Sequence, residues 1–226
     1  TTTTTETGEK FVSSQIEPVK KYVQDCVEIS SIKGLLTISK QGGYYDPVKY
    51  IELGNYKVSY ACYKSGNNYA NNLPLIEDIN LEFQQYMESA NTREELNKCL
   101  ANFNPFRDKG LNIKQGTLKV TSNIQFDKVV VNINYPLEIS KGDYTATVQN
   151  MFIDIPVTLG RAHKVASDIV NIECNNQKFD IDGYIKANPP LATIEMQEYQ
   201  SNLYVYLTTI TEANEIPVDF HFIIEK

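Results

Sequence analysis

The chain has 226 residues, of which 42% are hydrophobic and 22% are charged, so it can bury a sizeable core before any disulfide forms. Its formal net charge is −7 and its basic residues are scattered, which argues against a nucleic-acid partner, because such binding depends on clustered lysine and arginine. No apolar stretch approaches the roughly 20 residues needed to span a bilayer.

The first ten residues, TTTTTETGEK, contain no apolar side chain. Such a segment cannot bury enough surface to offset its ordering entropy, which is typical of a flexible tail, but threonine is β-branched and favours extended backbone. We therefore expect residues 1–12 to form an extended polar arm that adds a strand to the sheet of a neighbouring copy. The residues expected to contact this neighbour are Thr1, Thr2, Thr3, Thr4, Thr5, Phe11 and Val12.

Apolar residues at helical spacing begin at Ile16 and predict a helix that ends at Gly34. Pro18 is suited to the first turn of this helix, where its missing N–H would have no partner in any case. A loop dense in turn-forming residues follows at 41–47, and alternating residues over 56–62 then predict a strand.

Two further helices are predicted before the middle of the chain. Pro74 opens the first, and Thr92 begins the second, with Glu95 at the spacing of a capping box. Asn104-Pro105 is expected to stop the second helix, because the residue before a proline is disfavoured in helical conformation.

The second half of the chain is dominated by alternation with a period of two, which is typical of antiparallel strands with one buried face. Strands are expected over 118–124, 129–135, 144–148, 179–186, 192–199, 203–210 and 218–225, and a fourth helix over 157–173. The predicted fold class is α+β: a mainly antiparallel sheet of about seven strands with three or four packed helices. We expect residues 13–226 to form a single globular domain.

Four cysteines, at 26, 62, 99 and 174, indicate an oxidising, extracellular compartment, with buried free thiols as the alternative. They form no close pairs, which argues against a zinc site. Cys26 and Cys99 each lie on the apolar face of a predicted helix, so we expect them to pair. By elimination, Cys62 and Cys174 would form the second disulfide.

Candidate catalytic groups are few. His163 falls beside charged residues on a helix and is expected to be solvated, and His221 should point to the polar face of a strand. Asp180 and Asp182 precede a glycine, but the other ligands of a calcium loop are missing, so two carboxylates on a strand are the simpler interpretation. No nucleophile, phosphate-binding or zinc motif is present, and we predict no enzyme activity, no metal and no cofactor.

Tyrosine is unevenly distributed: seven of the 15 tyrosines fall between positions 44 and 69. Tyrosine offers a large contact area and a hydroxyl group, which suits a surface that binds sugar or protein. The alternative is that these rings brace loops around a strand.

Five segments stand in a particular order along the chain: PVKKYVQDCVEISSIKGLL, QGGYYDP, LPLIEDINLEFQQYMESANTREELNKCLANF, VVVNINYPLEI and RAHKVASDIV. Together they cover much of residues 18–170, and they resemble a group of exported, pilin-like surface proteins of small-genome (DPANN-type) archaea. The resemblance implies a protein that is exported and anchored near its N-terminus, with a pilin-like or adhesive role. It carries over no catalytic residue.

The sequence therefore favours an extracellular structural or adhesive protein of a cell surface, as the subunit of a filament that self-associates through its N-terminal arm. The alternative is a monomeric extracellular recognition domain that binds a cell-surface glycan or protein through its tyrosine-rich segment. An extracellular enzyme is the least favoured hypothesis.

Overall fold

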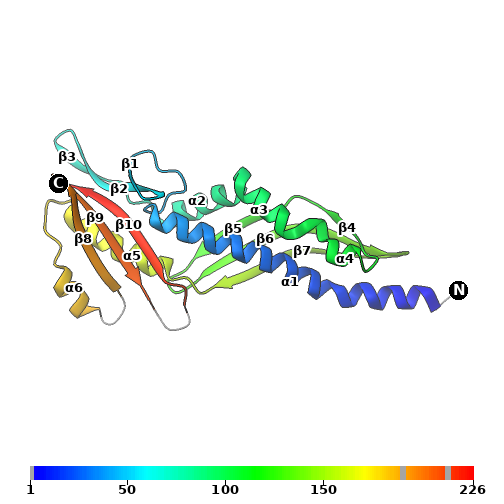
Figure 1. The fold of residues 1–226 in the computed structure, drawn as a ribbon. Helices are drawn as coiled ribbons and strands as arrows, with labels where there is room; N and C mark the ends of the chain where they lie inside the picture. Colours follow the sequence, from blue (N-terminus) through cyan, green and yellow to red (C-terminus); the bar gives the residue numbers. More distant parts are fainter. Residues whose placement is uncertain (1–2, 189–191, 212–214) are drawn as a thin grey trace.

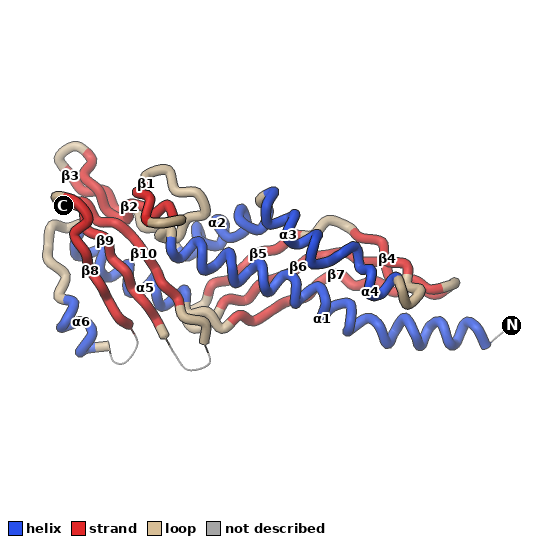
Figure 2. Tube along the Cα trace, in the orientation of Figure 1, coloured by secondary structure: helices blue, strands red, loops and turns tan. Residues whose placement is uncertain are grey.

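The computed structural model describes residues 3–188, 192–211 and 215–226, and it shows an elongated molecule (Figure 1). The N-terminus lies at one end and the C-terminus near the other. Two sheets follow one another along this length, with helices packed against them (Figure 2). The fold class is α+β with mostly antiparallel strands, as expected, but the strands form two sheets where one was predicted.

Helix α1 (Thr3–Lys40) is the longest element and runs beside the first sheet (Figure 1). Its buried apolar residues recur at helical spacing: Val12, Val19, Val23, Cys26, Val27, Leu35 and Ile38. The predicted helix end at Gly34 is wrong, because α1 continues to Lys40. The glycine serves a different purpose, since the ring of Tyr86 lies against it. A Cβ atom at Gly34 would stand 2.6 Å from Cδ1 of Tyr86. Glycine is therefore needed here for the close approach of α1 and α2 (Ile76–Glu88), and the helix continues through it.

The expected extended arm is wrong for the part of it that the structure describes, because residues 3–12 belong to α1. Pro18, which fits a first turn, consequently lies inside the helix. Helical backbone satisfies its N–H and C=O groups within the segment, and extending an existing helix adds one hydrogen bond for each residue fixed. Residues 3–12 therefore need no neighbouring strand. Thr1 and Thr2 lie outside the described residues.

The two apolar residues of the expected arm pack within the chain itself. Val12 is fully buried and belongs to the hydrophobic core. Phe11 is half-buried, and Nζ of Lys141 lies 3.8 Å from the centroid of its ring. Helix α1 runs without interruption across positions 12 and 13, where the arm was expected to meet the globular domain.

The first sheet contains four strands. They are β4 (Asn112–Gln115), β5 (Lys119–Ile124), β6 (Val129–Lys141) and β7 (Tyr144–Ile155). Strand β6 is central: β7 pairs along one edge, and β4 and β5 pair with different parts of the other. The alternating side chains of β6 that point inward are buried, and the helices lie on that side of the sheet: α1 packs on β6 and β7, α2 packs on β5, and α3 (Ala90–Leu100) packs on α1 and α2. The opposite face of the sheet is open to solvent. We call this sheet and these helices the spine region.

The second sheet contains six strands. They are β1 (Tyr50–Leu53), β2 (Tyr56–Ser65), β3 (Asn68–Asn71), β8 (Ala192–Gln200), β9 (Leu203–Ile210) and β10 (Val218–Glu225). Their order is β1-β2-β10-β9-β8, with β3 also on β2, and only the β2–β10 pair is parallel. Helix α5 (Leu159–Glu173) packs on this sheet. We call the second sheet with α5 and α6 (Ile181–Ala187) the head region.

Strand β10 is covered on both faces and connects the two regions. On one face, the ring of Phe220 lies edge-on to His163 of α5. On the other, Asp219 lies 3.9 Å from Nζ of Lys40, at the end of α1. The C-terminal end of α1 and helix α5 thus enclose the centre of the head sheet between them.

Two predictions of local structure are corrected. The strand expected over 179–186 is helix α6, because Asp180 caps that helix by accepting a hydrogen bond from the backbone N–H of Gly183. Helix α3 begins two residues before Thr92, because Ser89 provides its N-cap. It ends at Leu100, where three residues with positive φ lead through the 3-10 turn η1 (Ala101–Phe103) to the short helix α4 (Asn104–Arg107).

Candidate functional site

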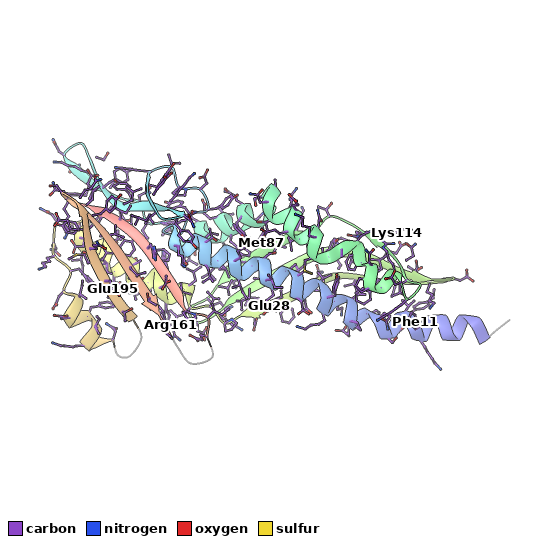
Figure 3. All side chains as sticks on the ribbon, in the orientation of Figure 1. Phe11, Glu28, Met87, Lys114, Arg161 and Glu195 are labelled. Carbon is purple, nitrogen blue, oxygen red and sulfur yellow. A yellow bond between two sulfur atoms is a disulfide. The ribbon has the colours of Figure 1, made fainter. Side chains whose placement is uncertain are left out.

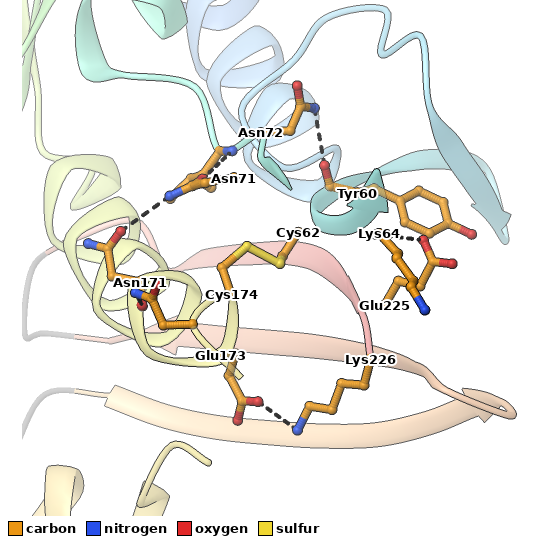
Figure 4. Close-up of a disulfide and its surroundings, with 12 residues drawn as sticks. Tyr60, Cys62, Lys64, Asn71, Asn72, Asn171, Glu173, Cys174, Glu225 and Lys226 are labelled. Atoms are coloured by element: carbon orange, nitrogen blue, oxygen red, sulfur yellow. Dashed lines mark hydrogen bonds and ion pairs between the residues drawn. A yellow bond between two sulfur atoms is a disulfide. The ribbon is translucent and has the colours of Figure 1, made fainter. Parts of the chain in front are cut away.

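All four cysteines form disulfides, with the pairing expected from the sequence. Cys26 joins α1 to Cys99 of α3 in the spine region, and Cys62 joins β2 to Cys174 at the end of α5 in the head region (Figure 4). The Cα atoms are 5.8 Å apart in each pair. The two covalent loops interleave along the chain, because Cys62 lies inside the loop closed by Cys26 and Cys99 while its partner lies outside.

A buried carboxylate lies next to the second disulfide. Glu173 is only 4% exposed, and it accepts hydrogen bonds from the backbone N–H of Phe179 and from the hydroxyl of Tyr206, each at 3.0 Å. Its other oxygen lies 2.6 Å from Nζ of Lys226 (Figure 4). Burial and the neighbouring carboxylate raise the pKa of Tyr206. The cluster links α5 to the C-terminus. Because both oxygens of Glu173 are occupied by groups of the chain itself, we interpret this carboxylate as structural.

The two histidines lie against opposite faces of the head sheet. His163 was expected to be solvated, but it is partly buried, and its Nε2 lies 2.7 Å from the carbonyl oxygen of Pro74. Burial lowers the pKa of both histidines. For His163 this contact ties α5 to the segment before α2, which is a structural role.

The tyrosine-rich segment is largely occupied in bracing its own loops. The hydroxyl of Tyr44 donates to the carbonyl of Asn72 at 2.8 Å, and the ring of Tyr45 packs edge-on against Tyr86 of α2. Nζ of Lys49 lies 3.7 Å from the ring centroid of Tyr63. These contacts fit the interpretation that the rings support the loops around β2.

A pocket of about 240 Å³ lies between α5 and α6. Its carboxylate, Asp168, accepts hydrogen bonds from Nζ of Lys164 and from the hydroxyl of Tyr184 at 2.9 Å. Burial, followed by the bond to Asp168, raises the pKa of Tyr184 to about 12. These polar groups already bind one another. A ligand in this pocket would therefore contact mainly its apolar wall, near Phe126 and Ile210.

The solvent-exposed face of the spine sheet carries a different surface. Neutral polar side chains lie beside one exposed aromatic ring across β5, β6 and β7, and we call these residues the amide face: Thr121, Asn132, Asn134, Asn150 and Phe152. Together with Lys119 they line an open depression of about 510 Å³. Phe152 is 65% exposed.

The amide face was missed in the sequence, although part of its signal is present there. Asn132 and Asn134 alternate with buried residues on β6, so their outward direction could be predicted. Which residues of β5 and β7 stand beside them depends on the strand register, and that was not predicted.

Among the described residues, no group of three histidine, cysteine, aspartate or glutamate side chains could hold a metal ion. In the same part of the chain, no helix is both long and apolar enough to cross a membrane. Comparisons with models of protein families, with curated proteins and with solved structures found no match to this chain. The two disulfides are consistent with an extracellular protein.

Proposed function

We propose that this chain is a structural or adhesive protein of a cell surface, built around α1. The observation that carries the proposal is that α1 is long and is covalently attached to the rest of the spine region. Its first turns extend beyond the other elements (Figure 1), and further along it is fixed to α3 through Cys26 and Cys99. A disulfide across packed helices opposes the sliding of one helix along the other, which suits a protein that carries load outside the cell.

The arrangement of the two ends supports the same proposal. Phe11 lies toward the end that holds the N-terminus, whereas Glu195, on β8, lies at the opposite end (Figure 3). A molecule attached or assembled through the N-terminal end of α1 would present its head region outward. Self-association remains part of the proposal, but it now involves helical turns of α1, because an extended arm is not available for strand addition.

The proposal is tested on native cells. Antibodies to the full chain should label the surface of cells that have not been permeabilised, and immunogold electron microscopy should show whether the label follows filaments or an array. Peptide mapping without reduction should recover the Cys26–Cys99 and Cys62–Cys174 peptides as linked pairs. Label confined to the cytoplasm, or free thiols in freshly lysed cells, would contradict the proposal.

A second candidate function is recognition of a cell-surface glycan by a monomeric protein, and the amide face favours it. Light scattering on the purified chain, together with microscopy of native material, separates the two. A monomer that labels the surface without filaments or an array supports recognition, whereas regular assemblies support a structural subunit.

A further inference from the structure

We propose that the amide face is a binding site for a neutral oligosaccharide, with one sugar ring stacked on Phe152 and its hydroxyl groups bonded by the surrounding amides. The inference rests on the proposed function, because it names the ligand class for an adhesive surface protein. It assigns the binding role to the spine sheet and not to the tyrosine-rich segment of the head.

The strand register places the polar groups on two sides of the aromatic ring. Asn132 of β6 is directly opposite Phe152, and Thr121 of β5 is directly opposite Asn132. Asn150 precedes Phe152 by two residues on β7 and therefore points to the same face. Neighbouring strands lie about 4.8 Å apart and alternate residues about 6.8 Å apart, so Asn132 and Asn150 lie beside the ring at distances comparable to the width of one sugar, and Thr121 lies one strand beyond Asn132.

The chemistry of these groups matches sugar hydroxyls. Each asparagine amide offers both donors and an acceptor, and a hydroxyl group can likewise donate and accept. An exposed aromatic ring offers a flat apolar surface to the C–H face of a sugar, while a few placed polar groups fix its orientation.

The charges of the surrounding sheet favour a neutral ligand. Asp154 lies 2.7 Å from Nζ of Lys128 beyond one end of the amide face, and Glu138 lies 2.7 Å from Nζ of Lys114 beyond the other. These ion pairs neutralise the carboxylates nearest the site along the strands. Lys119, on β5, is left in register with Asn134 of β6, and it is two strands away from Phe152 of β7. Apart from Lys119, the side chains that line the depression are therefore uncharged.

The site is also held in place before any ligand binds. The side-chain amide of Gln24, on α1, donates to the backbone carbonyl of Phe152 at 2.8 Å and so fixes the edge of β7. The amide of Asn134 donates to Oδ1 of Asn150 at 3.0 Å. Just beyond this pair the register of β6 and β7 shifts, and such a bulge bends the sheet locally. Fixed side chains lose less conformational entropy on binding.

The test uses the full chain with both disulfides intact. Neutral oligosaccharides of glucose, galactose, mannose and N-acetylglucosamine are screened on an array, and the best binder is then titrated by calorimetry. We expect Phe152→Ala to weaken binding about tenfold or more, since it removes the stacking surface, and Asn132→Ala to weaken it about fivefold. The NMR signals that shift on titration should include those of residues on β5, β6 and β7.

Two control variants make the test specific. Phe126 is 60% exposed and lies outside the amide face, so Phe126→Ala removes a similar exposed ring and should change affinity less than about twofold. Lys119→Gln should also have less than about a twofold effect if the ligand is neutral. Thermal unfolding of each variant checks that the fold is kept, as expected for substitutions at an exposed position.

Several outcomes would overturn the inference. They are an absence of binding to any neutral oligosaccharide at millimolar concentration, equal losses for Phe152→Ala and Phe126→Ala, or binding only to acidic sugars that is abolished by Lys119→Gln. Dissociation of an oligomer by Phe152→Ala would make this face a contact between copies, and would also overturn it. Surface label without glycan binding leaves the proposed function standing, whereas glycan binding by a protein found only in the cytoplasm removes the proposed function alone.

Discussion

The spine and head sheets differ in how far apart along the chain their paired strands lie. In the spine, β5, β6 and β7 follow one another and pair through short connections. The head joins two runs of consecutive strands, β1-β2-β3 and β8-β9-β10, through the pairing of β2 with β10. There the backbone N–H of Lys64 donates to Glu225, 161 positions further along the chain. Closing a long loop costs more entropy than forming a hairpin. The head sheet should therefore depend more on its disulfide and buried polar groups than the spine does.

The largest expected effect comes from removing the head disulfide. Replacing Cys62 and Cys174 together by alanine should lower the free energy of unfolding by about 2–5 kcal/mol, because the unfolded chain is then less restricted. Replacing Cys26 and Cys99 in the same way should cost less, because neighbouring hairpins and helices still hold the spine together. Urea denaturation of both double variants measures the difference.

Hydrogen exchange locates the loss. In the variant without the head disulfide, amides of β2 and β10 should lose protection before those of β6 and β7. Simultaneous opening of all four strands would show that the two regions unfold as one unit, and would remove the distinction between them.

A smaller loss is expected from the buried carboxylate of the head. Glu173→Ala would leave the Tyr206 hydroxyl and the Phe179 N–H without their acceptor, which should cost about 2–4 kcal/mol. Glu94→Ala is the matched control, because Glu94 forms an exposed ion pair with Lys98 on α3 and should contribute less than about 1 kcal/mol. Equal midpoints for the two variants in urea would mean that the Glu173 cluster does not stabilise the head.

Mild acid should lower the free energy of unfolding least, and it should again act on the head region. Burial lowers the pKa of His163, which faces the Pro74 carbonyl and Glu77, and of His221, which lies near Asp219 and Lys40. The folded state thus binds fewer protons than the unfolded state below about pH 6.5, so stability should fall as the pH falls from there. Unfolding midpoints at pH 7.5, 6.5 and 5.5 measure this slope. A slope unchanged by His163→Gln would exclude His163 as a contributor.

Local patterns were sufficient to identify strands in both regions. Alternation predicted β6 and β7 of the spine and β8, β9 and β10 of the head, because each of these strands pairs with a neighbour in sequence. The apolar faces that carry Cys26 and Cys99 likewise indicated their disulfide. The partition of the strands into two sheets was not predicted, because it depends on pairing between distant segments.

Other errors arose where one residue type serves two purposes. Gly34 is typical of a helix end, but here it accommodates the ring of Tyr86, a contact that the sequence does not reveal. Asp180 was assigned to a strand, although the same side chain also suits a helix N-cap. For the amide face, the outward direction of Asn132 could be predicted, whereas its position opposite Phe152 required the register.

The interleaved disulfides have a consequence for a chain exposed to proteases. Because Cys26 pairs with Cys99 and Cys62 with Cys174, one backbone cut anywhere between residues 26 and 174 leaves both fragments covalently joined. Two cuts in different intervals between successive cysteines still leave three linked fragments, and only a third cut, in the remaining interval, separates the chain into two covalent pieces. Pairing neighbouring cysteines instead would allow one cut between residues 62 and 99 to divide the molecule. A nicked copy of this protein should therefore keep its halves together until its disulfides are reduced.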